Sequence, residues 1–313
     1  MTLDPGPAPE GRRIVAADGH GYHVVSLSGA ARETSDRPVP DLTEKDRTDA
    51  TPLVLLHGGG PGCSGWTDFG VVAPMFASRR TVHLVDLLQY GASDKPVLSG
   101  PRWSTLATSM VSLFDAMGLE RVDVVCNSWG GTIALALAAE HPQRVRALVI
   151  TGSMPVLDGP LCPLPEGGRR GRNARDRYYG GEGPSPDAMR DLMARLEWWD
   201  PAQIPARTVE LRYRQSVDPE EVALAGGSDD ARGEPQDLSG HLRSIEAAVL
   251  FCWGMADAFL TPDYPLMLAN MVPRGQLYVM DRASHHLQEE RPGDFHAVVG
   301  GFLDQDHDRE GLR

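Results

Sequence analysis

The 313-residue chain has no long apolar run and carries an excess of acidic over basic side chains. No segment approaches the roughly 18 consecutive apolar residues of a membrane-spanning helix. The first residues, MTLDPGPAPEGRR, lack the basic-then-apolar order of a signal peptide. Asp and Glu number 43 against 30 Lys and Arg, a formal net charge of −13, which repels phosphate backbones and anionic lipids. We therefore expect a cytoplasmic protein with no nucleic-acid or membrane partner.

Cysteine is also scarce, with four residues in unrelated contexts and no CxxC spacing: Cys63, Cys126, Cys162 and Cys252. This pattern favours reduced thiols over a disulfide framework or a zinc site, so no metal is expected. Apolar residues make up 41% of the chain and charged residues 23%, which is typical of a globular protein with a packed core.

Short apolar segments carry the strand signal. They do not alternate in polarity, which is typical of a parallel sheet covered by helices on both faces. The segments are residues 21–29, 53–58, 81–87, 122–127, 146–153, 247–254 and 276–281. Helical patterns at 105–118 and 131–142 separate some of them, so strands and helices alternate. We predict an α/β fold with a mostly parallel, twisted sheet flanked by helices.

Two intervals break this rhythm. The polar stretch 30–52 is predicted to be an exposed, mobile loop. The interval 155–240 begins and ends in Gly- and Pro-rich turns and holds amphipathic helical patterns at 186–199 and 206–217. We predict a helical lid over 155–240, inserted into a core formed by 1–154 and 241–313.

The segment CNSWGGT, residues 126–132, joins a predicted strand to a predicted helix. A serine at such a junction, with a small residue two positions away on each side, is the pattern of a nucleophile elbow, G-x-S-x-G. Gly130 fills the second glycine position, and Cys126 stands at the first. Taken alone, the motif leaves open that Ser128 is an ordinary helix N-cap.

The order of the remaining candidates strengthens the nucleophile interpretation. On this architecture the nucleophile is followed along the chain by an acid and then a histidine. Asp257 follows a predicted strand end, and His285 and His286 follow the last predicted strand. Asp263 is a rival acid, but it comes after Pro262 and is expected to open a helix as its cap. We predict a catalytic triad of Ser128, Asp257 and His285.

The glycine-rich loop LLHGGGPG after the first strong strand is the candidate oxyanion hole. Glycines at 58, 59 and 60 allow backbone N–H groups to turn inward. A phosphate-binding loop would need the lysine of GxxxxGK[ST], which is absent here, or GxGxxG followed by an acidic residue about 20 positions on, and Pro61 does not suit either form. We expect Gly59 and Trp129 to supply the two amide donors.

These motifs, with GMADAFLTPD and SHHLQEERPGDF, resemble the α/β-hydrolase fold and, within it, the meta-cleavage-product hydrolases. Those enzymes cleave a carbon–carbon bond in 2-hydroxy-6-oxo-hexa-2,4-dienoates. The resemblance implies that Arg212, in VELRYRQS, binds the substrate carboxylate and 2-oxo group, with Asn127, Gly58 and His286 also at the substrate. It departs from the family pattern at Cys126, at Ser284 in place of glycine and at His286 in place of tryptophan.

The resemblance implies hydrolysis of a vinylogous 1,5-diketone acid with no metal or organic cofactor. Two alternatives stay open. The same triad could act on an ester, lactone or thioester of secondary metabolism. The scaffold could instead serve as a non-hydrolytic ligand-binding protein or a cyclase. The sequence leaves the acyl group and any homo-oligomer undetermined.

Overall fold

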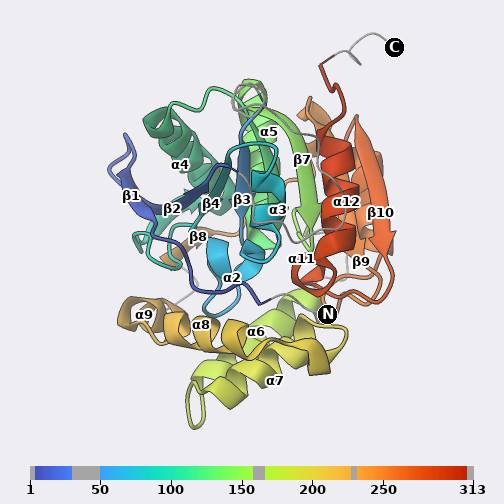
Figure 1. Ribbon diagram of the computed structural model, residues 1–313. Coiled ribbons are helices and arrows are strands. Elements are labelled where there is room, and N and C mark those ends of the chain that lie inside the picture. Colours follow the sequence, from blue (N-terminus) through green and yellow to red (C-terminus); the bar gives the residue numbers. More distant parts are fainter. Residues whose placement is uncertain (1–3, 30–49, 158–165, 227–230, 309–313) are drawn as a thin grey trace.

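An eight-stranded sheet forms the centre of the computed structural model, which describes residues 4–29, 50–157, 166–226 and 231–308 (Figure 1). The strand order is β1-β2-β4-β3-β6-β7-β9-β10. The bounds are β1 Arg12–Val15, β2 Gly21–Leu27, β3 Leu53–Leu56, β4 Val82–Val85, β6 Val122–Asn127, β7 Val145–Thr151, β9 Ala248–Gly254 and β10 Gly275–Met280. The strands from β4 to β10 are parallel, whereas β1 and β2 form an antiparallel edge.

The central strands are buried along their whole length, which explains their unbroken apolar sequences. Every residue of β3, β6 and β9 is buried, as a parallel sheet covered on both faces requires. All seven predicted strands are present. The four-residue β1 was not predicted because three of its four residues are exposed and give no apolar signal.

Helices cover both faces of the sheet. On one face lie α4 Arg102–Met117, α5 Trp129–Glu140 and α10 Asp263–Met271; on the other lie α2 Gly65–Phe69, α3 Ala73–Ala77 and α12 Pro292–Leu303 (Figure 1). Smaller elements are α11 Leu287–Glu290 and the 3-10 helices Pro142–Arg144, Pro201–Gln203 and Leu242–Ser244. Helix α5 lies close to the segment after β7 because it has a glycine at position 131. A β-carbon at Gly131 would lie 1.9 Å from Ser153 Oγ.

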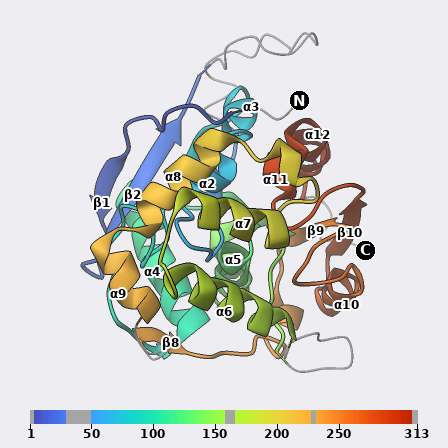
Figure 2. The same ribbon diagram turned by 90° about the horizontal axis from the view of Figure 1, so that it is seen from below.

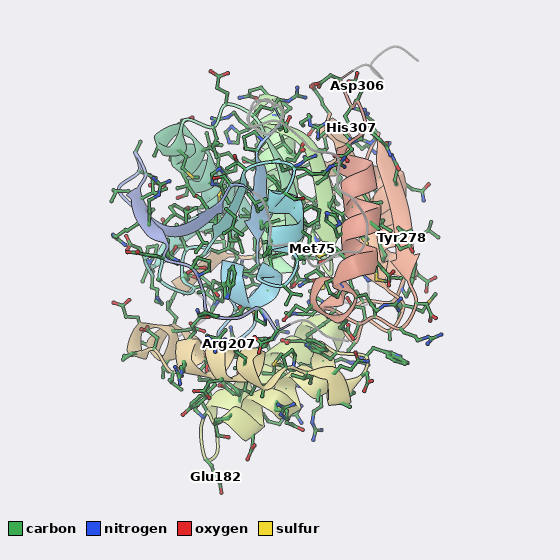
Figure 3. The ribbon with its side chains drawn as sticks, in the orientation of Figure 1. Met75, Glu182, Arg207, Tyr278, Asp306 and His307 are labelled. Carbon is green, nitrogen blue, oxygen red and sulfur yellow. The ribbon has the colours of Figure 1, made fainter. Side chains whose placement is uncertain are left out.

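Four helices form a lid across the carboxyl ends of the parallel strands (Figures 1 and 2). They are α6 Glu166–Tyr179, α7 Pro186–Leu196, α8 Ala206–Ser216 and α9 Pro219–Gly226. The lid has a small apolar core of its own around Met189, Met193 and Trp198. Glu182, between α6 and α7, and Asp306 lie at opposite ends of the molecule (Figure 3). The lid covers the carboxyl-terminal edge of the sheet, which is the edge where functional loops of α/β proteins lie.

The return from the lid makes a second, two-stranded sheet. β8, Arg232–Glu234, falls within the interval predicted as lid but pairs in parallel with β5, Leu98–Pro101, of the core. The predicted loop at 30–52 lies almost wholly outside the described residues. In the described part of the chain no helix is long and apolar enough to cross a membrane. Cys63, Cys126 and Cys252 are free and buried, and Cys162 lies outside the described residues.

Candidate active site

Ser128 lies on a sharp turn between β6 and α5, with φ 51° and ψ −113°. A non-glycine residue with positive φ is uncommon, and such strain is typical of functional sites. The Ser128 amide donates to the carbonyl of Thr151 at 2.7 Å, which fixes the turn to the neighbouring strand. The Ser128 side chain makes no capping hydrogen bond to α5. The turn thus presents a hydroxyl that the helix does not use.

The close approach of strand and helix explains the small residues around Ser128. A β-carbon at Gly130 would lie 2.4 Å from the carbonyl oxygen of Leu56, so this position requires glycine. At Cys126 the side chain is accommodated in the core, where Sγ donates to the carbonyl of Val149 at 3.2 Å. Burial raises the pKa of the Cys126 thiol well above its usual value, so this cysteine is a packing residue.

His285 and Asp257 lie together above the carboxyl end of the sheet. His285 Nδ1 is 2.8 Å from Asp257 Oδ2, and both residues are almost completely buried. Asp257 Oδ1 accepts hydrogen bonds from the amides of Phe259 and Leu260 at 2.8 and 3.0 Å. The rival acid, Asp263, is the first residue of α10, and that helix has no side-chain cap bond, so the expected capping role is wrong.

Two residues hold the histidine in place. Gly152 has φ +57°, and a β-carbon there would lie 2.4 Å from His285 Cε1. Asn127 Nδ2 donates to the His285 carbonyl and to Thr151 Oγ1, each at 2.9 Å. The side-chain amide of Asn127 therefore holds the main chain of His285 close to β6, the strand that precedes Ser128. In the described part of the chain its Oδ1 has no hydrogen-bond partner.

Neighbouring main-chain amides of the glycine loop differ in whether they are already hydrogen-bonded. The Gly58 amide donates to Asp68 Oδ2 at 2.8 Å, whereas the Gly59 and Trp129 amides donate to none of the described residues. His57 fixes the loop: Nε2 accepts from the Leu87 amide, so Nδ1 carries the proton and donates to the Gly58 carbonyl. Gly59 and Trp129 are thus the amides available to a developing oxyanion.

Ser128, His285, Gly59 and Trp129 all line one cavity of about 570 Å³ beneath the lid. This volume falls in the range of small-molecule sites. Within the described residues the Ser128 hydroxyl makes no hydrogen bond, and catalytic hydrogen bonds often tighten only when substrate binds. The same residues include no cluster of three or more His, Cys, Asp or Glu side chains that could hold a metal ion.

Arg212 does not line this cavity. It is fully buried and forms a bidentate ion pair with Glu197, in which Nη2 lies 3.1 Å from Oε1. Its Nε and Nη2 also donate to the Pro61 carbonyl at 3.1 and 2.9 Å. The family resemblance implies that Arg212 binds the substrate, whereas in the structure its guanidinium is paired with Glu197. Glu197, on a different part of the lid, carries no sequence signal that reveals this pairing.

Two lid helices thus hold the glycine loop from above. Arg212 of α8 binds Pro61, and Glu221 Oε1 of α9 accepts from the Gly62 amide at 2.8 Å. Gly62 has φ +67°, and a β-carbon there would lie 1.9 Å from the Arg212 carbonyl oxygen. The loop that carries Gly59 is therefore bonded directly to the lid.

His286 lines the cavity beside a buried group of acids. Its Nδ1 lies 2.6 Å from Glu289 Oε2, and its Nε2 lies 3.9 Å from Glu197 Oε2. Burial alone would lower the pKa of His286, but Glu197, Glu289 and Asp68 raise it to about 9. His286 is thus a cation at neutral pH. The spacing of three between His286 and Glu289 on a helical turn is the one sequence signal for this pair.

Comparison with known proteins agrees with this architecture. Residues 51–292 match the family model for the alpha/beta hydrolase fold. The 2-hydroxymuconate semialdehyde hydrolase of Pseudomonas sp. (strain CF600) is 33% identical over 257 residues, which cover 80% of this chain and 86% of that protein. A 2-hydroxy-6-oxononadienedioate/2-hydroxy-6-oxononatrienedioate hydrolase 2 of Pseudomonas putida is 30% identical over 258 residues, with 81% and 88% covered.

A solved structure is similar over nearly the whole chain. A mutant of the meta-cleavage product hydrolase from Pseudomonas fluorescens IP01, complexed with acetates, superposes with a TM-score of 0.74. The match covers 94% of this chain and 97% of that one at 22% sequence identity. At 22% identity this similarity shows a shared fold.

Proposed function

Because this chain belongs to the α/β-hydrolase family, we propose that it is a carbon–carbon bond hydrolase acting on a 2-hydroxy-6-oxo-hexa-2,4-dienoate. The observation that carries the proposal is the cavity lined by Ser128, His285, Gly59 and Trp129, in which two main-chain amides are available to an oxyanion. The relatives at 30% identity or more, named as hydrolases of 2-hydroxymuconate semialdehyde and of 2-hydroxy-6-oxononadienedioate, support this substrate class.

The first step is tautomerisation of the dienol to its keto form. Without it, the departing carbon would leave as an unstabilised carbanion; after it, that carbon leaves as a conjugated dienolate. His286, the other histidine that lines the cavity, is already protonated at neutral pH. As a cation His286 cannot accept a proton, so we assign to His285 the removal of the 2-hydroxyl proton, its delivery to C5, and the later role of base to Ser128.

Ser128 Oγ then adds to the C6 carbonyl while His285 Nε2 takes the hydroxyl proton. Asp257, bonded to Nδ1, holds the ring with Nε2 towards the serine and stabilises the imidazolium. The amides of Gly59 and Trp129 donate to the oxyanion that forms. Collapse of this adduct breaks the C5–C6 bond, and His285 protonates the dienolate.

A water molecule completes the cycle by hydrolysing the acyl-serine, again with His285 as base. The products are a carboxylic acid from the C6 end and a 2-hydroxydienoate from the C1 end. Asn127 is a positioning residue in this scheme, because its side-chain amide holds the His285 main chain.

The test follows the visible colour of 2-hydroxy-6-oxo-6-phenylhexa-2,4-dienoate mixed with purified protein. We expect rapid loss of colour with the native protein and none with Ser128→Ala. A phosphonate probe for reactive serines is applied in parallel. Labelling of Ser128 without loss of colour would overturn the carbon–carbon assignment and direct attention to esters, lactones or thioesters.

A further inference from the structure

Apolar and cationic side chains both line the cavity around Ser128. The serine follows β6, which lies between β3 and β7 in the sheet. The loops after β7 and β9 supply the apolar side chains of Met154, Phe259 and Leu260. The cations that line the cavity are Arg102 and Arg232, which approach the side chain of Trp129, and Arg172 and Arg175 of α6. A ligand with one apolar and one anionic end therefore finds partners for both ends.

Arg232 is the buried one of these cations. It is 4% exposed, and its guanidinium lies 5.5 Å from the Trp129 ring centroid and 5.6 Å from that of Tyr90. Its Nη1 donates to the Tyr90 hydroxyl at 2.8 Å. In the part of the chain that the structure describes, its Nε–H is buried without a hydrogen-bond partner. A buried donor on a charged group is costly to leave unsatisfied.

No carboxylate neutralises Arg232 directly among the described residues, where it takes part in no ion pair. Glu221 and Tyr179 interact with it only at longer range. Glu221 uses one oxygen to accept from the Gly62 amide. Arg212 differs from Arg232 in this respect, because its guanidinium is already paired with Glu197 and hydrogen-bonded to the Pro61 carbonyl.

Arg102 holds the segment that carries Arg232. Its Nε donates to the Arg232 carbonyl at 2.6 Å, and its Nη2 donates to the Gly233 carbonyl at 3.0 Å. Gly233 has φ +79° and packs against Gly100 and Arg102, so the turn requires glycine. The Arg102 guanidinium also lies 5.1 Å from the Trp129 centroid. Two cations thus lie over the indole of the residue next to Ser128.

Resting on the proposed function, we propose that Arg232, positioned by Arg102 and Tyr90, binds the C1 carboxylate of the dienoate in place of Arg212. The carboxylate supplies the acceptor that the buried Nε–H lacks, and a guanidinium matches its planar geometry. The C6 substituent then packs against the apolar side chains of Phe259 and Met154, which line the same cavity. Substrate binding at Arg212 would instead have to displace Glu197 from a buried ion pair, which is strongly unfavourable.

The experiment measures binding without turnover. Ser128→Ala protein is titrated with 2-hydroxy-6-oxo-6-phenylhexa-2,4-dienoate and with its C1 methyl ester, and the dissociation constants are read from the ligand absorbance. We expect the acid to bind about 10 to 100 times more tightly than the ester. Adding Arg232→Gln should bring this ratio close to one, and Arg232→Lys should restore part of it. Adding Arg214→Gln removes an exposed arginine paired with Glu210 and should leave the ratio unchanged.

Circular dichroism and the thermal midpoint show whether each variant is folded. If Arg232→Gln does not fold, the ratio measured in Arg232→Lys is used instead. A ratio equal to that of the parent would contradict recognition of the carboxylate by the Arg232 guanidinium. An unchanged ratio in folded Arg232→Gln, or no preference for the acid in the parent, overturns the assignment. The proposed function is judged separately, by whether protein with Ser128 intact removes the colour. Acid preference at Arg232 without turnover would reject the proposed reaction and retain the carboxylate site.

Discussion

The imidazole of His285 lies against Gly152, at a position where a β-carbon would come within 2.4 Å of Cε1. This contact makes the glycine part of the mechanism that positions the base, although it bears no functional group. Substitution by alanine would push the ring away from Ser128 and also strain a backbone with φ +57°.

We expect Gly152→Ala to lower kcat by about 100-fold or more, since a small displacement of a catalytic group can cost that much. The matched control is Gly118→Ala, which has a similar φ of +69° and, among the described residues, no atom within 4 Å of the added carbon. Gly118→Ala should lose about 1 kcal/mol of stability, and Gly152→Ala should lose more because its added carbon also meets the His285 ring; urea unfolding measures both. Equal effects on kcat would show that the His285 contact is unimportant.

Asp257→Asn is expected to reduce kcat by about 10² to 10⁴ because the amide cannot hold the imidazole in the required tautomer. Asp263→Asn serves as the control, since Asp263 begins α10 and does not touch His285. Steady-state kinetics on the dienoate compare the two variants. A large effect of Asp263→Asn with a small effect of Asp257→Asn would reverse the assignment of the acid.

Cys126→Ala should leave turnover unchanged, because the thiol is buried with its Sγ on the Val149 carbonyl. Its raised pKa keeps it protonated at neutral pH. Loss of the sulfur and its hydrogen bond should cost about 1 to 2 kcal/mol of stability. Kinetics and urea unfolding on the same preparation measure both quantities. Abolished turnover in a stable variant would identify a chemical role for the cysteine.

Stability should fall as pH rises from 6.5 to beyond 9, because the pKa of His286 is raised to about 9 in the folded protein. The charged imidazole faces Glu197, Glu289 and Asp68, with Arg212 on the far side of Glu197. A raised folded pKa contributes stability that is complete below the unfolded value of 6.5 and is lost as pH passes the folded value.

The loss should be on the order of 3 kcal/mol, measured as the free energy of unfolding in urea at pH 6, 8 and 10. His286→Gln removes one titrating group and should make the profile less steep over this interval, where Glu289, whose pKa burial raises to about 7, still titrates. A profile that is equally steep in the variant would assign the pH dependence to other groups.

The α/β fold and the family resemblance are confirmed, and both could be predicted because they depend on local signals. Fully buried strands such as Val122–Asn127 give apolar runs that the sequence displays directly. The order of Ser128, Asp257 and His285 can also be read directly from the sequence. Their catalytic roles remain predictions.

Side-chain pairing could not be predicted in the same way. Glu197 and Arg212 lie on separate parts of the lid, and only its folding brings them together. Arg232 reaches the cavity because β8 pairs with β5, which lies more than 130 residues earlier in the chain. Both are tertiary contacts without a local periodicity, so the sequence could not indicate that Arg232 lines the cavity and Arg212 does not.

The bonds from the lid to Pro61 and Gly62 have a thermodynamic consequence. Raising α8 and α9 would break the contacts of Arg212 and Glu221 with the loop that carries Gly59. Opening of the lid and loosening of the loop with the proposed oxyanion donors would therefore be linked equilibria, and linkage is reciprocal. A ligand bound to the two proposed amide donors would then favour the closed lid, and a change that opens the lid would weaken binding at these amides by the same factor.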